Sequence, residues 1–346
     1  MPRGSLNTTF MFNTPGDLFS AFQSMGIVLS SYNSKVSIPI NLFNRKNRKV
    51  NYAILELLIE AKRVTPEWRL KVENVNITRQ FKPTHYLAIG DGERGLYKFV
   101  YDVTSILNAS EVISKEWVNI LIKYEGGDPF AVKYILLDAI YDEIDAYTNY
   151  KHSTGLLVLE PGERYHYPIE EHAAKSLNYR LVTYTPRQSE IKLYTRNSTL
   201  AIRTQQEGAE DHTLTFSENP GSLTLELNAP LRSYAVISSI TAYNCSIKEP
   251  RLELCNLDYS LSGNKVLLKL RVCNKGESSP DRLVISIMSR GNVLCSIQDP
   301  EVNIPPGGEI ERTIEVPKGK FNDVNIRLVW FKSTRRWLRD EVLKFH

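Results

Sequence analysis

The sequence predicts an all-β protein made of tandem β-sandwiches, and three observations lead to this fold class. The chain contains 18 Tyr and 12 Phe among many Val, Ile, Leu and Thr, which are the residues that suit a pleated, half-buried surface. Apolar and polar residues alternate in short runs along most of the chain, as they do in strands with one buried face. Residues that favour turns separate these runs at the close spacing typical of sandwiches.

The length of the chain indicates how many domains it forms, and its charge bears on the kind of partner it binds. A chain of 346 residues is long enough for two or three domains. Its net charge of +4 comes entirely from residues 327–346, because residues 1–326 are formally neutral. A charge this small does not indicate a nucleic-acid partner, so we expect none.

The first predicted domain covers residues 1–152. Leu18, Phe19 and Phe22 fall on one side at helical spacing, which predicts a short helix within residues 15–25. Strand-like runs follow this helix: VSIPINLF, YAILELLIEAKRV, WRLKVENVNITRQ, HYLAIG, YKFVYDVTSIL, WVNILIKYEG and AVKYILLDAIYDEID.

The order of the last of these runs resembles a known fold family. A strand containing Tyr101, Asp102, Val103 and Thr104 precedes WVNILIKYEGG and a closing apolar strand. This order is similar to the end of galactose-binding-like jelly rolls. The resemblance covers about residues 37–147 and implies a jelly-roll sandwich.

The second predicted domain covers residues 153–248. It begins near a turn at residues 160–163, and further turns are predicted at 218–221 and 228–230. Between them lie alternating runs that predict a second, smaller sandwich: LNYRLVTYTP, EIKLYTR, LAIRTQQ, HTLTFS, GSLTLELN and YAVISSITAYN.

The third predicted domain covers residues 249–346 and has the clearest pattern of strands and hairpins. Three sequence features stand out within residues 250–332: Val272-Cys273-Asn274-Lys275-Gly276, Arg290-Gly291-Asn292, and Ile304-Pro305-Pro306-Gly307-Gly308-Glu309 before Ile314-Glu315-Val316-Pro317. They resemble the CARDB family of immunoglobulin-like domains found in adhesion-related surface proteins. The resemblance implies an immunoglobulin-like sandwich.

Cysteines and glycosylation sequons give weaker signals. The four cysteines, Cys245, Cys255, Cys273 and Cys295, form no C-x-x-C pair, which argues against a zinc or redox site. Cys255 and Cys273 fall in neighbouring predicted strands, so the alternatives are one or two disulfides or free buried thiols. Candidate N-glycosylation sites are Asn7, Asn76, Asn108, Asn197 and Asn244.

Catalytic motifs are missing from the sequence. It contains no Gly-rich phosphate loop, G-x-S-x-G elbow, H-E-x-x-H motif or Cys/His pattern, so we predict no enzyme, metal or cofactor. Asp138, Asp142, Glu143 and Asp145 are candidates for the carboxylate pair of a glycosidase. We expect them instead to form a solvated strand end that blocks unwanted pairing.

Two basic segments are the candidate binding residues. Arg45, Lys46, Arg48 and Lys49 lie between two strand-like runs, which predicts a hairpin tip that faces an anionic partner or only solvent. At the C-terminus, the candidates are Trp330, Arg335, Arg336, Trp337 and Arg339. A hairpin that turns at residues 333–336 is favoured there, and the alternative is a basic amphipathic helix for an anionic membrane surface.

We therefore expect a non-catalytic structural or adhesive protein that binds a glycan or a protein, with self-association open. The alternatives are a carbohydrate-active enzyme with accessory sandwiches and a virion capsid or spike subunit. The sequence shows no apolar run near the ~18 residues of a transmembrane segment and no signal peptide. A cell-surface, extracellular or virion location is expected, and a cytoplasmic one is the alternative.

Overall fold

The computed structural model describes residues 2–45, 47–62, 67–77, 82–89, 93–169, 177–204, 207–218, 220–231, 233–317 and 323–345. Apart from two one-turn helices, α1 (Thr104–Leu107) and α2 (Ser110–Ile113), the regular elements of these residues are strands. The predicted all-β fold class is therefore confirmed. Neither helix is long or apolar enough to span a bilayer.

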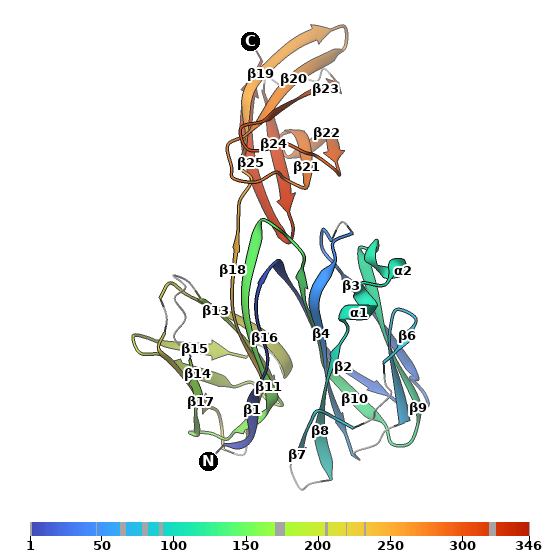
Figure 1. Ribbon diagram of the computed structural model, residues 1–346, viewed down its shortest axis with the longest axis vertical. Coiled ribbons are helices and arrows are strands. Elements are labelled where there is room, and N and C mark those ends of the chain that lie inside the picture. Colours follow the sequence, from blue (N-terminus) through green and yellow to red (C-terminus); the bar gives the residue numbers. More distant parts are fainter. Residues whose placement is uncertain are drawn as a thin grey trace. The chain divides into compact units, whose positions relative to one another are not determined.

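The chain forms two compact units (Figure 1). The first comprises Met1–Leu42 and Asn47–Ser246, and the second comprises Phe43–Lys46 and Ile247–His346. The first unit holds β1 (Arg3–Pro15), β2 (Asp17–Leu29), β3 (Lys35–Asn41), β4 (Val50–Ala61), β5 (Glu67–Val72), β6 (Val75–Asn76), β7 (His85–Ile89), β8 (Arg94–Asp102), β9 (Trp117–Gly126), β10 (Phe130–Tyr141), β11 (Ala146–Leu159), β12 (Arg164–Pro168), β13 (Leu177–Thr185), β14 (Glu190–Tyr194), β15 (Thr199–Arg203), β16 (Gly208–Phe216), β17 (Ser222–Asn228) and β18 (Ala235–Ile247).

These strands form four sheets. Sheet A has the order β1-β11-β18-β13-β16, sheet B the order β2-β10-β4-β8-β7, sheet C the order β3-β9-β5-β6, and sheet D the order β12-β17-β14-β15. Sheets A and D enclose one apolar core, to which Leu181 and Leu225 belong. On the other side of sheet A, a second core that includes Leu136 and Val182 joins it to sheet B. Trp68 of sheet C packs edge-on against Phe99 of sheet B, so the layers follow the order C, B, A, D.

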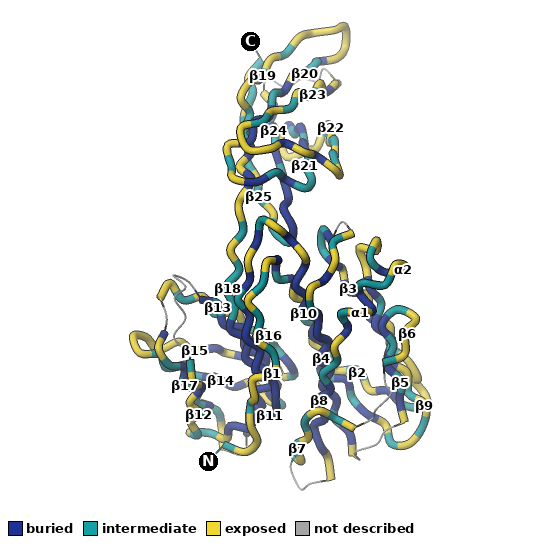
Figure 2. Tube along the Cα trace, in the orientation of Figure 1, coloured by how far each residue is buried: buried dark blue, intermediate teal, exposed yellow. Residues whose placement is uncertain are grey.

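The four-layer arrangement explains the long apolar runs in the sequence. Sheets A and B each have a neighbouring sheet on both faces, so their central strands bury side chains of both parities (Figure 2). A strand buried on both faces shows a nearly continuous apolar run instead of alternation. The run YAILELLIEA in β4 is such a strand.

The predicted N-terminal helix is wrong. Residues 17–29 form β2, which pairs antiparallel with β10 from Asp17↔Tyr141 to Leu29↔Phe130, with one irregularity. Pairing along a long buried strand outweighs the local helical spacing of three apolar residues, because tertiary contacts override weak propensity.

The second unit is a sandwich of two sheets around one core. Sheet E has the order β19-β20-β23 and sheet F the order β22-β21-β24-β25. Their strands are β19 (Leu252–Ser262), β20 (Lys265–Asn274), β21 (Arg282–Ser289), β22 (Asn292–Asp299), β23 (Glu309–Pro317), β24 (Asp323–Lys332) and β25 (Arg335–Lys344). Cys255 and Cys273 form a disulfide that links β19 to β20, whereas Cys245 and Cys295 are not disulfide-bonded.

Asn274 fixes several loops of the second unit to its core. Its buried side chain donates from Nδ2 to the carbonyls of Ser278 and Ile304, both at 2.7 Å, and accepts at Oδ1 from the amides of Arg251 (3.1 Å) and Gly276 (2.8 Å). At Gly276, a Cβ would lie 2.3 Å from the backbone of Arg251. The asparagine and the glycine of this segment therefore have structural roles.

Candidate functional site

The predicted basic hairpin tip is wrong in its geometry. The strand before it, β3, pairs with β9 in sheet C, whereas the strand after it, β4, pairs in sheet B. The segment is therefore a connection between two sheets. Arg45 is buried, Arg48 forms an ion pair with Glu143 at 2.9 Å, Lys49 is exposed, and Lys46 lies outside the described residues.

The predicted C-terminal hairpin is confirmed, and this excludes the amphipathic helix. β24 and β25 pair from Asp323↔Lys344 to Lys332↔Arg335, which leaves a turn of two residues in place of the predicted four. Trp330 is buried and donates from Nε1 to the carbonyl of Pro250 at 2.8 Å.

The remaining candidates of this hairpin lie on β25. Trp337 packs partly buried against the core, and Arg339 forms ion pairs with Glu253 (3.2 Å) and Glu341 (2.9 Å). Arg335 is half-buried and Arg336 is exposed. The cations of this segment therefore lie along a strand rather than in a pocket.

The candidate glycosylation residues differ in accessibility. Asn7, Asn76 and Asn197 are exposed. Asn108 is half-buried, and its amide both donates to and accepts from the backbone of Val50 at 2.8 Å. Asn244 is half-buried on β18.

The acidic cluster of β10 does not form a fully solvated strand end. Asp138 is 2% exposed and Glu143 is 5% exposed. Asp138 accepts hydrogen bonds from Ser20 (2.7 Å) and Tyr150 (2.8 Å), and Arg180 pairs with it. The prediction failed because it treated β10 as an edge strand, whereas β10 lies between β2 and β4.

A second buried polar cluster lies between sheets A and B. Lys98 Nζ and His152 Nε2 lie 3.1 and 2.9 Å from Glu56 Oε1, and Thr154 donates to the same oxygen at 2.7 Å. Lys98 also donates to the carbonyl of Ser238 at 2.6 Å. Burial would raise the pKa of Glu56, but Lys98, His152 and Thr154 outweigh it and hold this pKa well below its ordinary range. Because the ionised groups are sealed from solvent, this cluster joins the sheets and offers no access to a substrate.

Asp211 of β16 also faces Arg180, the cation that pairs with Asp138, but it is only weakly compensated. Its Oδ1 lies 3.8 Å from Arg180 Nε, too far for a hydrogen bond, and both atoms lack a partner in the described structure. Burial, with a contribution from Asp138, raises the pKa of Asp211 to about 6 despite the opposing effect of Arg180.

Asp211→Asn is therefore expected to stabilise the first unit at pH 7.5 by about 1–3 kcal/mol. The folded-state pKa lies above the ordinary value of 3.8, so Asp211 costs stability as pH rises from about 4 to 6 and a constant amount above that. Urea unfolding from pH 4 to 8 measures this difference. The gap between variant and wild type should close near pH 4, and an equal gap at every pH would contradict the assignment.

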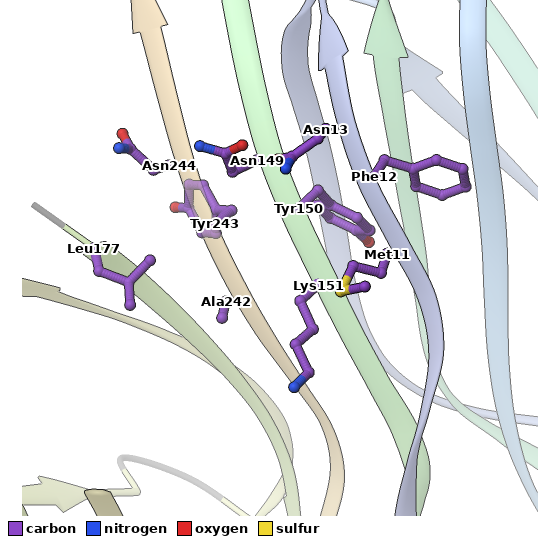
Figure 3. Close-up of a pocket in the computed structure, with 10 residues that line it drawn as sticks. All are labelled: Met11, Phe12, Asn13, Asn149, Tyr150, Lys151, Leu177, Ala242, Tyr243 and Asn244. Carbon is purple, nitrogen blue, oxygen red and sulfur yellow. The ribbon is translucent and has the colours of Figure 1, made fainter. Parts of the chain in front are cut away.

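An open groove on sheet A is the candidate binding site. It encloses about 550 Å³ and is lined by Met11, Phe12, Asn13, Asn149, Tyr150, Lys151, Leu177, Ala242, Tyr243 and Asn244 (Figure 3). Sheet D packs on the same face of sheet A further along β11, where Leu157 and Leu159 enter the shared core. The groove lies where Asn149 and Lys151 continue that face of the strand.

The floor of the groove follows from strand register. Asn13 pairs with Asn149 and Met11 pairs with Lys151, so these four side chains form two rows across β1 and β11. β18 is the next strand of the sheet, and Figure 3 shows its Asn244 in line with the other two asparagines. Three side-chain amides therefore lie side by side across three strands.

None of these three amides forms a side-chain hydrogen bond with the described part of the protein. Each amide offers two N–H donors and a carbonyl acceptor. Lys151 adds a largely buried stem, and Met11 adds an apolar side chain that is 64% exposed. Of this site only Asn244 was noted from the sequence, as a sequon, since no local pattern in the chain reveals that β1, β11 and β18 are neighbours.

Three further grooves among the described residues contain a pair of carboxyl groups. In one of about 260 Å³ the pair is Asp299 and Glu301, and Arg312 already binds Asp299 at 2.9 Å. In a second of about 400 Å³, Glu60 and Asp128 line the wall, but Lys133 (2.6 Å) and Arg94 (3.2 Å) already bind Glu60. In another of about 360 Å³, the pair is Glu210 and Asp211. These two are consecutive on β16, so their side chains point to opposite faces of the sheet.

No protein-family model and no curated protein matches the sequence. A β-glucuronidase from Ruminococcus gnavus in complex with N1-substituted uronic isofagomine is similar at 11% identity and TM-score 0.22, over 59% of this chain and 37% of that chain. Apo β-glucuronidase 3 from Bacteroides uniformis is similar at 7% identity and TM-score 0.24, over 57% of this chain and 27% of that chain. Wild-type OgpA from Akkermansia muciniphila is similar at 12% identity and TM-score 0.21, over 28% of each chain. This chain thus spans less than two fifths of the length of each of these proteins, and likenesses at such TM-scores identify no activity for it.

Proposed function

We propose that this protein is a non-catalytic binding protein that recognises a glycan in the groove on sheet A. The observation that carries the proposal is the row of Asn13, Asn149 and Asn244, whose amides have no side-chain hydrogen bond to the described protein. We expect the protein to bind this glycan at the surface of a cell or particle.

The chemistry of the row supports a polyhydroxylated ligand. A sugar hydroxyl both donates and accepts, and a primary amide presents both functions in one plane. The amides lie on strands, which are more rigid than loops, so binding costs less conformational entropy than it would at a loop. Met11 offers an apolar contact for the C–H face of a sugar ring beside this polar row.

The lining of the groove favours binding over catalysis. Glycoside hydrolysis requires two carboxyl groups on either side of the scissile bond, and the described lining residues include no carboxylate. The carboxyl groups of Glu56 and Asp138 are buried between sheets and form ion pairs, so they cannot act on a substrate in the groove.

The double variant Asn13→Ala/Asn149→Ala is expected to weaken glycan binding roughly 10- to 100-fold. Each lost neutral hydrogen bond contributes about 0.5–1.5 kcal/mol, and 1.4 kcal/mol corresponds to a factor of ten. A glycan array with the full chain identifies the ligand, and calorimetry with that glycan then compares the variants.

Asn197→Ala is the matched control, because Asn197 is an exposed asparagine outside the groove. It should bind like the wild type. The proposal is overturned if the folded protein binds no glycan on the array, or if the double variant binds as tightly as the control. Hydrolysis of a bound glycan by the wild type would support the enzyme alternative instead.

A further inference from the structure

The edge strand β25 of sheet F is rich in charged residues. Among the described residues, β25 pairs only with β24, so one of its sides has no partner strand (Figure 1). Of its ten residues, RRWLRDEVLK, six are charged and alternate in burial between half-buried and exposed. Charges on an edge strand usually prevent pairing with another chain, so their order along β25 decides whether this edge repels or attracts a copy of itself.

The turn geometry determines which backbone groups face the open side. The hairpin has a two-residue turn closed by the pair Lys332↔Arg335, and such a closing pair exchanges both of its backbone hydrogen bonds. Every second residue from Arg335 therefore bonds to β24. The intervening residues, Arg336, Leu338 and Asp340, direct their N–H and C=O groups to the open edge.

Only one nearby symmetric register matches the charges. When two β25 strands lie antiparallel with Leu338 opposite Leu338, Arg336 faces Asp340 and Arg335 faces Glu341, twice each by symmetry. Centring the pair on Arg339 places that arginine opposite itself, and centring it on Asp340 places two carboxylates opposite each other. In the register centred on Leu338, the residues that face each other also include those whose N–H and C=O groups point to the open edge.

The outer face of sheet F supports the same register. Val284, Val329 and Leu338 form one apolar row across three strands, and Leu338 is 56% exposed at its end. A second copy centred on Leu338 would extend this row without interruption. Arg336 has no ion pair within the described chain. Asp340 already accepts a hydrogen bond from Arg327 at 2.7 Å. A carboxylate has further acceptor sites, so it can bind a second donor.

We propose that β25 is a self-association edge, at which two copies of this chain join their F sheets antiparallel about Leu338. The partner is a second copy because the charges, the open backbone groups and the apolar row of one strand complement the same strand in reverse.

Sedimentation velocity of the full chain over a wide concentration range tests this proposal. The wild type should convert from monomer to dimer as concentration rises, and the dimer should weaken with added salt because its ion pairs lie near solvent. Leu338→Glu places two like charges on the axis and should weaken dimerisation at least tenfold, since such a contact costs several kcal/mol. Arg336→Glu should act in the same direction.

Val293→Glu is the matched control, since Val293 is equally exposed (60%) but lies on β22 at the opposite edge of the sheet. It should dimerise like the wild type. Hydrogen exchange provides a second readout: the amides of Arg336, Leu338 and Asp340 should gain protection with concentration. A wild type that stays monomeric throughout, or a Val293→Glu variant that loses the dimer together with Leu338→Glu, would overturn the proposal.

Discussion

Replacement of Lys98 by methionine is expected to lower the free energy of unfolding by about 3–5 kcal/mol. Lys98 and Glu56 are both fully buried, 3.1 Å apart. Removal of the cation leaves the Glu56 carboxylate with His152, Thr154 and a long hydrogen bond from Tyr134 (3.4 Å), in a site without solvent. An uncompensated buried charge is far more costly than the loss of a surface pair.

Chemical denaturation at pH 7 measures this effect. Arg164→Met is the control, because Arg164 pairs with Glu226 at the surface, and it should leave the free energy of unfolding almost unchanged. The wild type should also lose stability as pH falls below about 4.5, the ordinary pKa of Glu56, because its folded-state pKa is depressed. A loss below 1 kcal/mol for Lys98→Met would show that the pair is not needed for the joint between sheets A and B.

Asn274→Ala is expected to cost the second unit about 3–5 kcal/mol. The substitution removes four hydrogen bonds and leaves two buried carbonyls, of Ser278 and Ile304, without their amide donor. Each bond contributes about 1 kcal/mol, and each orphaned buried group adds a desolvation cost.

Thermal unfolding, followed by a probe specific to the second unit, tests this prediction. Asn256→Ala is the comparison, because Asn256 is exposed on β19 and, within the described residues, its side chain bonds only to Asp258. This variant should change stability by less than about 0.5 kcal/mol. Asn274→Asp should be as damaging as alanine, because a carboxylate oxygen would face two carbonyls. A mild effect of both Asn274 variants would contradict the structural role assigned to this side chain.

Local patterns in the sequence predicted the all-β class with tandem sandwiches, but not which distant strands pair. In the second unit, β19–β20, β21–β22 and β24–β25 are hairpins of consecutive strands, so alternation and turns were enough to predict the C-terminal hairpin. In the first unit, β2 pairs with β10 and β1 with β11, and these distant pairings have no local signature. The helix assigned to residues 15–25 failed for this reason.

The buried charges have a signature in the sequence. Glu56 lies within YAILELLIEA and Asp138 within YILLDAIY. A single charge inside an apolar run indicates a strand buried on both faces, with an opposite charge on a facing strand. The partner itself, Lys98 or Arg180, could not be chosen without the sheet order. The row of asparagines in the groove depended on the same missing information.

The pairing of β1 with β11 has a consequence for how the chain is made. Arg3 pairs with Val158, and sheet A is complete only when β18, which ends at Ile247, joins between β11 and β13. At a synthesis rate of about 5–20 residues per second, β1 therefore waits roughly 10 to 50 s for the last strand of its sheet. Folding dominated by such distant pairings is slow. Until β11 has been synthesised, β1 is an unpaired strand that neighbouring nascent chains can capture, and protection of this segment should raise the yield of folded protein.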